Sequence, residues 1–212
     1  MIFKSYLLKN NIKTLNSYNI FLFYGENYGL KQDLKIQIKK FYKSSEKINL
    51  VQEEIINNKN LLTNEIFNKS LFNDTKIYFI EQANDKILTF LQEIEASVSK
   101  EKIFIFAEML EKKSKLRSYF EKSKIYGVCP CYEDNIITIK SIISQKLHGY
   151  TGLTPEVINF IIESAGLQRN RINNEIEKIK ACFADKRIDY SKIELLLNIK
   201  TNDDFNKLRD EA

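Results

Sequence analysis

The sequence has few of the residues on which metal-binding and secreted proteins rely. It contains three cysteines, Cys129, Cys131 and Cys182, and a single histidine, His148. An odd number of cysteines does not make a complete disulfide framework, and C-x-C is not the spacing of a zinc half-site. A zinc site would require all four side chains to converge, which their spacing does not favour. We therefore expect no metal or other cofactor and a reducing, cytoplasmic compartment.

Long apolar runs are also missing. No stretch approaches the roughly 18 consecutive apolar residues of a membrane span. The N-terminal stretch, MIFKSYLLKNNIK, lacks the long apolar region and the small-residue cleavage site of a signal peptide. The chain has 212 residues, of which 43% are hydrophobic and 29% charged, and this is ordinary for a soluble globular protein of one fair-sized domain or two small ones.

Charge does not by itself identify a partner. The net charge is +5, from 33 basic and 28 acidic residues that are interspersed along the chain. Basic residues are denser at 35–43 and 112–124, but a dedicated nucleic-acid-binding protein usually clusters its charge more strongly. A solvated helix face explains each segment as well, so the composition permits contact with nucleic acid without arguing for it.

Five short apolar runs alternate with amphipathic helical patterns over the first two thirds of the chain. Parallel neighbours in a sheet need crossover connections, and the crossovers here are helical. The pattern therefore predicts an α/β fold with a parallel five-stranded sheet flanked by helices. The expected strands cover residues 20–24, 47–51, 77–81, 103–107 and 125–128.

The first strand, its glycine turn and the following helix lie where a phosphate-binding loop of the pattern G-x-x-x-x-G-K-[ST] would be. Gly25 and Lys31 match, but Leu30 stands at the second glycine position and Gln32 at the hydroxyl position. Leu30 would put a side chain where backbone amides must approach phosphate, and Gln32 is a poor magnesium ligand. The segment is either a phosphate loop that has lost its ligand or a plain strand-to-helix turn. In both cases we expect no ATP hydrolysis.

The pattern changes after Pro130, and no further run resembles a strand. Asn135 and Thr154-Pro155 are typical helix starts, and the apolar residues that follow them repeat at helical spacing. We expect an α/β domain over 1–135 and a small all-α domain over 136–200. Residues 201–212 are typical of the opening of one more helix, and we expect the chain to stop where a third domain begins.

The segment before the third strand reads KSLFNDTKIYFIEQ over 69–82. A helical pattern ends there in Leu71 and Phe72, and Asn73-Asp74 supplies a turn. The Leu-Phe pair can fold back onto the sheet or point outward as an anchor for a partner. Residue chemistry alone favours packing onto the sheet, because most apolar residues in such segments are buried.

An α/β domain with a phosphate-loop position, followed by a small helical lid, is the AAA+ layout. Within that class the sequence resembles the delta subunit of the bacterial DNA polymerase III clamp loader over nearly its whole length. The similar stretches are FLFYGEN at 21–27, SLFNDTKIYFIEQAND at 70–85, IFIFAEMLEKKSKLRSYFEK at 103–122 and AGLQRNRINNEIEKIKACF at 165–183. The chain departs from the family at its C-terminal end, where a helical collar domain assembles the pentameric loader.

The resemblance implies a role in DNA replication without catalysis, because the delta subunit binds no nucleotide and opens the ring-shaped sliding clamp. It implies that Leu71 and Phe72 insert into an apolar pocket of the clamp, with Ser70 and Asn73 beside them, which reverses the interpretation of this pair. The implied partners are the beta sliding clamp, the gamma/tau and delta-prime subunits, and primer-template DNA, with no membrane. Without its collar the chain is expected to be a monomer.

Three other functions are compatible with parts of the sequence. An active AAA+ or other P-loop NTPase is disfavoured by Leu30, by Gln32 and by Glu81-Gln82, which end the third strand where an Asp-Glu pair belongs. A stand-alone nucleic-acid-binding protein would use the basic residues at 35–43 and 112–124. A different loader subunit, delta-prime, usually has a cysteine-rich zinc insert and a Ser-Arg-Cys element, and the sequence has neither.

Overall fold

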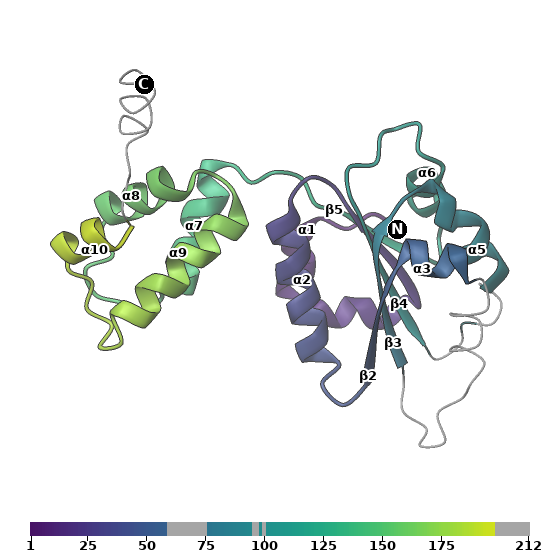
Figure 1. The fold of residues 1–212 in the computed structure, drawn as a ribbon, viewed down its shortest axis with the longest axis horizontal. Coiled ribbons are helices and arrows are strands. Elements are labelled where there is room, and N and C mark those ends of the chain that lie inside the picture. The colour runs from purple at the N-terminus through teal and green to yellow at the C-terminus, as the bar shows by residue number, and fades with distance from the viewer. Residues whose placement is uncertain (59–75, 95–97, 99–100, 198–212) are drawn as a thin grey trace, which may run out of the picture. The chain divides into compact units, whose positions relative to one another are not determined.

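The computed structural model describes residues 1–58, 76–94, 98 and 101–197. The chain divides between Glu133 and Asp134 into two compact units. The first unit contains, in chain order, α1 (Ser5–Asn10), the 3-10 helix η1 (Ile12–Ser17), β1 (Ile20–Tyr24), α2 (Tyr28–Phe41), β2 (Glu46–Val51), α3 (Gln52–Asn57), β3 (Lys76–Ala83), the 3-10 helix η2 (Asp85–Ile87), α5 (Leu88–Ile94), β4 (Lys102–Ala107), α6 (Lys115–Lys122) and β5 (Gly127–Pro130), as Figure 1 shows.

Within the described residues, the strands form one five-stranded sheet in the order β2-β3-β4-β1-β5, and each neighbouring pair is parallel. β1 lies between β4 and β5, with Ile20 opposite Ile103 and Phe21 opposite Gly127. All five residues of β1 are buried, as expected for a strand covered on both faces. The prediction of a parallel five-stranded sheet flanked by helices is confirmed.

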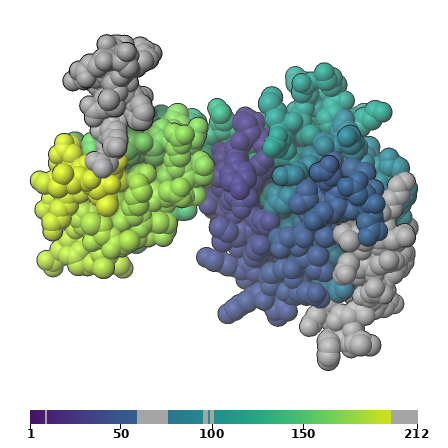
Figure 2. Space-filling model, in the orientation of Figure 1, coloured from purple at the N-terminus to yellow at the C-terminus, as the bar shows by residue number. Residues whose placement is uncertain are grey.

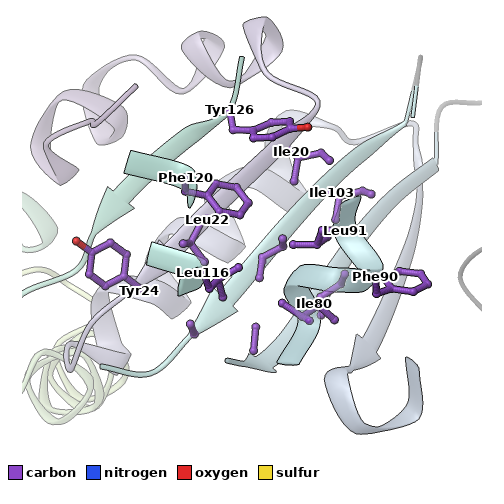
Figure 3. Close-up of a cluster of buried hydrophobic side chains, with 14 of the residues drawn as sticks. Ile20, Leu22, Tyr24, Ile80, Phe90, Leu91, Ile103, Leu116, Phe120 and Tyr126 are labelled. Carbon is purple, nitrogen blue, oxygen red and sulfur yellow. The ribbon is translucent and has the colours of Figure 1, made fainter. Parts of the chain in front are cut away.

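Two apolar clusters cover the two faces of this sheet. On one face, α1, η1 and α2 pack against phenylalanine side chains of β1, β3 and β4. On the other face, α3, η2, α5 and α6 pack against the residues that alternate with these along the strands. Figure 3 shows the second cluster, to which α5 contributes Phe90 and Leu91 and α6 contributes Leu116 and Phe120. The alternation of side chains along each strand therefore produces two separate cores.

The fifth strand begins two residues later than its sequence pattern predicts. The backbone N–H groups of Ile125 and Tyr126 both donate to Ser123 Oγ at 3.1 Å, which forms a turn instead of a strand end. Ile125 is 62% exposed. Pairing starts at Gly127, where a Cβ atom would lie 2.2 Å from the ring of Phe21. The apolar run at 125–128 is thus part turn and part strand.

The second unit is helical and contains α7 (Ile136–Lys146), α8 (Pro155–Ala165), α9 (Arg169–Cys182) and α10 (Tyr190–Leu197). Asn135 caps α7 by accepting the N–H of Thr138 at 2.8 Å, and Thr154 caps α8, which begins at Pro155. The apolar stripes of the helices meet in one cluster that includes Ile139, Ile143, Ile161, Ile172, Ile176 and Ile179. The helix starts read from the sequence are confirmed.

Candidate functional site

The turn after β1 requires a glycine. Gly25 has a φ of +133°, and a Cβ atom there would lie 2.3 Å from the carbonyl oxygen of Cys131. Its N–H donates to the carbonyl of Glu108 at 3.0 Å, and the N–H of Cys131 donates to the carbonyl of Tyr24 at 2.6 Å. The ends of β4, β1 and β5 are therefore held together at this turn by backbone hydrogen bonds.

Asn27 occupies the N-terminus of α2. Its Oδ1 accepts the N–H of Leu30 at 2.9 Å, its Nδ2 donates to the carbonyl of Tyr132 at 3.0 Å, and the side chain is only 7% exposed. The N–H of Asn27 donates to the carbonyl of Cys131 at 3.0 Å. A phosphate-binding loop offers the amides of the turn and of the first helical turn to its anion. Here Asn27 supplies an internal acceptor in place of that anion.

Two further amides of this turn already have backbone acceptors. The N–H of Tyr28 donates to the carbonyl of Glu26 at 2.8 Å, and that of Lys31 donates to the carbonyl of Asn27 at 3.2 Å. An incoming phosphate would therefore have to displace existing hydrogen bonds before it could be bound. We call this segment the closed turn, because the amides of Tyr28, Leu30 and Lys31 already have acceptors within it.

Leu30 lies in the core and not in the loop. It is 2% exposed and packs in the same apolar cluster as Leu34 and Ile38. The expectation that its side chain would project into the space of the phosphate is therefore wrong. Leu30 takes part in the turn only through its backbone N–H, which donates to the side chain of Asn27.

Lys31 points into the protein. It is 7% exposed, and its Nζ donates to the carbonyl oxygens of Gly25 at 2.8 Å and Ala107 at 2.7 Å. Burial lowers the pKa of the Lys31 ammonium, and the nearby carboxylates of Glu108 and Glu81 oppose that shift. In a phosphate loop the lysine reaches the phosphates of the nucleotide. Here its charge instead joins the ends of β1 and β4.

The end of β3 carries a carboxylate that already has a cationic partner. Lys35, one turn after Lys31 on α2, donates from Nζ to Glu81 Oε1. The next residue, Gln82, is exposed and has a φ of +57°, at a shift in the pairing between β3 and β4. Gln32, at the hydroxyl position of the pattern, is a half-buried residue of α2. At the two positions where an NTPase would hold its magnesium ion, this chain thus has a glutamine, Gln32, and a glutamate that is paired with a lysine, Glu81.

A buried ion pair stands at the start of the helical unit. Arg169, the first residue of α9, is 4% exposed and contacts Asp134 through two nitrogens, with Nε donating to Oδ2 at 2.7 Å and Nη2 donating to Oδ1. Neither Arg169 nor Asp134 belongs to a motif that predicted a role for it, and the same holds for Asn27. For Asn27 a signal was present, because an asparagine directly before an apolar helical stripe is typical of a helix cap.

Part of the predicted site lies outside the described residues. Ser70, Leu71, Phe72 and Asn73, the predicted clamp-binding residues, all fall in the stretch 59–75. Their role stays a prediction.

The cysteines are free thiols, with Cys129 and Cys131 buried and Cys182 exposed. In the described part of the chain, no three histidine, cysteine or acidic side chains gather closely enough to hold a metal ion.

The fold is AAA+-like, since a parallel sheet followed along the chain by a small helical unit is also found in the solved structures that it resembles. The Bacillus subtilis DNA clamp loader delta protein matches with a TM-score of 0.59 and 14% identity, over 91% of this chain and 62% of that protein. The Holliday junction branch migration motor RuvB of Thermotoga maritima matches with a TM-score of 0.54 and 10% identity, over 90% of this chain and 68% of that one. Trip13 from Rhizobiales matches with a TM-score of 0.52 and 11% identity, over 93% and 82%.

The likeness to the delta protein agrees with the resemblance found in the sequence. This chain spans 62% of the length of the Bacillus subtilis protein. At 14% identity the likeness establishes the fold. No protein-family model and no curated protein sequence matches the chain. None of the helices in the described ranges is both long enough and apolar enough to cross a membrane.

Proposed function

We propose that the chain is a delta-type subunit of a DNA clamp loader, which binds and opens the sliding clamp during DNA replication and has no ATPase activity. The AAA+-like fold and its likeness to the Bacillus subtilis clamp loader delta protein support this class. The observation that carries the non-catalytic part is the closed turn, in which Asn27 accepts the Leu30 amide and Lys31 is bound to two backbone carbonyls.

The mechanism would use binding energy and no covalent chemistry. A ligand shifts a conformational equilibrium only by the difference between its affinities for the two states, so the chain must bind the opened clamp more tightly than the closed one. Leu71 and Phe72 would supply this contact as two adjacent apolar anchors, flanked by Ser70 and Asn73. Gamma/tau and delta-prime subunits would provide ATP-dependent control in the cytoplasm, and primer-template DNA would enter the assembled complex.

The first test is binding of the chain to a bacterial beta clamp by surface plasmon resonance at moderate salt. The Leu71→Ala/Phe72→Ala variant should bind at least about 100-fold more weakly, because buried aromatic and apolar anchors contribute several kcal/mol. A matched control is Met109→Ala/Ile137→Ala, which also removes two apolar side chains, at positions that are 70% and 75% exposed. The control should bind the clamp as the wild type does.

The outcomes separate the alternatives. Unchanged clamp binding by the folded Leu71→Ala/Phe72→Ala variant would remove the anchor role, and unfolding of that variant would return the pair to the core. A folded wild-type chain that does not bind the clamp would contradict the proposal as a whole.

The competing function, a P-loop NTPase, is tested by calorimetric titration with ATP and Mg²⁺. We expect no binding, because the amides of Tyr28, Leu30 and Lys31 already have acceptors and Lys31 Nζ is bound to two backbone carbonyls. A dissociation constant below about 1 mM, the upper range of enzyme KM values, would favour the NTPase instead. The two titrations are independent, so clamp binding and nucleotide binding can fail separately.

A further inference from the structure

A group of lysines lies at the C-terminal end of α2, whereas the closed turn lies at the N-terminal end of this helix. Ile36, Lys39, Lys40, Lys43 and Lys47 line a hollow of about 480 Å³. We call these four lysines the lysine cradle. Three of them come from the end of α2 and the turn after it, and Lys47 comes from β2, at the edge of the described sheet. The segment that joins α2 to β2 can be followed in Figure 1, and side chains of this blue region project from the surface in Figure 2.

The pleat of β2 directs Lys47 to the same face as α2. Ile48 and Leu50 pack into the apolar cluster on the opposite face of the sheet, so Lys47 lies on the α2 face. Its Nζ donates to the backbone carbonyls of Lys43 at 3.1 Å and Ser45 at 2.7 Å. These bonds fix the Lys47 ammonium beside the turn that follows α2.

The cradle has an excess of positive charge. Among the described residues that line it, none is acidic. The carboxylate that acts on Lys39, that of Glu81, is hydrogen-bonded to Lys35. Lys39 lies over the ring of Phe79, 5.2 Å from its centroid. Burial, and then the ammonium groups of Lys35 and Lys47, lower the pKa of Lys39. Lys39 therefore lies among positive charges, and an anion bound beside it would favour its ammonium form.

Lysine ammoniums on flexible stems suit one chemical class of anion. Carboxylates are recognised most specifically by the planar fork of arginine, whereas lysine binds phosphate as a point charge. The lining here contains four lysines and no arginine among the described residues. A row of phosphates, as in a nucleic acid backbone, can engage several such groups at once without any reading of bases.

We propose that the lysine cradle binds the phosphate backbone of DNA independently of base sequence. The choice of DNA over other polyphosphates rests on the proposed function, in which the chain works beside primed DNA. The cradle would give this subunit a DNA contact of its own, on the face of the sheet covered by α2.

The test is fluorescence anisotropy of the full chain with two labelled DNA duplexes of unrelated sequence, over a series of salt concentrations. The variant Lys40→Gln/Lys43→Gln removes two exposed ammoniums, and glutamine at position 40 keeps a good helix former in α2. We expect about 10-fold weaker binding at low salt and a log–log salt slope that is smaller by about 1.8, or about 0.9 for each lost phosphate contact. Both duplexes should respond equally.

The matched control is Lys112→Gln/Lys113→Gln. It removes the same charge from two exposed lysines next to α6, which covers the opposite face of the sheet. The control should retain the wild-type salt slope. Equal losses in both variants would overturn the proposal, because they would show that DNA binding is not specific to the lysine cradle. Wild-type binding by the cradle variant, or absence of DNA binding by the wild type, would overturn it as well.

Two further measurements complete the design. If inorganic phosphate displaces the duplex at constant ionic strength, the cradle is a site for an isolated phosphate group and the proposal falls. Clamp binding by the cradle variant should equal that of the wild type, since its lysines are not among the predicted clamp-binding residues. A chain that binds DNA through the cradle but ignores the clamp would contradict only the proposed function.

Discussion

Restoring the phosphate-loop motif should not restore nucleotide binding. The double substitution Leu30→Gly/Gln32→Thr converts the segment 25–32 to G-x-x-x-x-G-K-T, which fulfils the sequence pattern. It does not remove the Asn27 side chain from the amide at position 30, nor Lys31 from the carbonyls of Gly25 and Ala107. We therefore expect a variant that matches the motif and still fails to bind Mg²⁺-ATP.

The same substitution should be strongly destabilising. Leu30 is 2% exposed, and truncating a buried leucine to alanine costs about 2–5 kcal/mol. A glycine in a helix costs about 0.5–1 kcal/mol more than alanine. The sum of roughly 3–6 kcal/mol is a large part of the stability of a typical domain, about 5–15 kcal/mol. Gln32→Thr alone, at a half-buried position, is the matched control and should stay within about 1 kcal/mol of the wild type.

The assay pairs urea unfolding, followed by far-UV circular dichroism because the chain has no tryptophan, with titration of a fluorescent ATP analogue. The two readouts test different steps of the reasoning. A folded double variant that binds the analogue with a dissociation constant below about 100 µM, or −5.5 kcal/mol, would refute the argument that the turn is closed by Asn27 and Lys31. A loss of less than about 1 kcal/mol would refute the core position of Leu30.

Two polar contacts give further predictions. Asp85 accepts hydrogen bonds from Ser114 Oγ at 2.6 Å and from two N–H groups at the start of α6, and these bonds lower the pKa of its carboxyl group, the Ser114 bond most. Since the folded pKa lies below the ordinary value of about 3.9, this stabilisation is present above that pH and is lost as the pH falls through the folded pKa. Asp85→Ala should cost about 1–2 kcal/mol at pH 7 in urea unfolding, as the loss of a helix-capping side chain does. A difference between the two proteins that does not shrink as the pH falls below the ordinary value of about 3.9 would contradict the ionic contribution. Arg169→Met should destabilise the helical unit by about 3–5 kcal/mol, because it leaves Asp134 buried without its cation. The double variant Arg169→Gln/Asp134→Asn should recover part of this loss in free energy of unfolding. Equal losses in both variants would argue against the charge as the cause.

The strands could be predicted because each is a short apolar run with a turn beside it. β1 begins and ends at the predicted residues 20 and 24, and β4 differs from its predicted range by one residue. The fifth strand was displaced because Ser123 captures the amides of Ile125 and Tyr126, and a hydroxyl that binds backbone two and three residues away leaves no trace in hydrophobic periodicity.

The site was predicted less well than the fold, and Leu30 shows why. Leu30 is followed by Leu34 and Ile38 at intervals of four residues, which is the spacing of one helix face, yet its position in the motif suggested a place in the loop. The stripe was the correct guide, since a helix can direct a side chain to only one face. Asn27 was overlooked because it occupies an unspecified position of the motif. The lysine cradle could not be predicted without the pairing of β2, because Lys47 lies on that strand and approaches the end of α2 only in the folded chain.

The two motif residues that remain, Gly25 and Lys31, have structural reasons to be present. Any other residue at Gly25 would collide with the carbonyl of Cys131, and Lys31 holds the ends of β1 and β4 together. A partial match to a nucleotide-binding motif can therefore reflect the architecture of the sheet without a nucleotide.

The free energies of the hydrogen bonds made by Lys31 and Asn27 can be compared with the free energy of nucleotide binding. A hydrogen bond to a charged group contributes about 1.5–3 kcal/mol, so releasing Lys31 from two carbonyls costs about 3–6 kcal/mol. Displacing the Asn27 cap costs about 1 kcal/mol more. A phosphate loop with a dissociation constant of 1 µM gains about 8.2 kcal/mol from its nucleotide, and most of that gain would be consumed here, which leaves an affinity in the millimolar range or weaker. We therefore propose that internal competition for the Leu30 amide and the Lys31 ammonium disfavours nucleotide binding, and that the missing glycine contributes little to this effect.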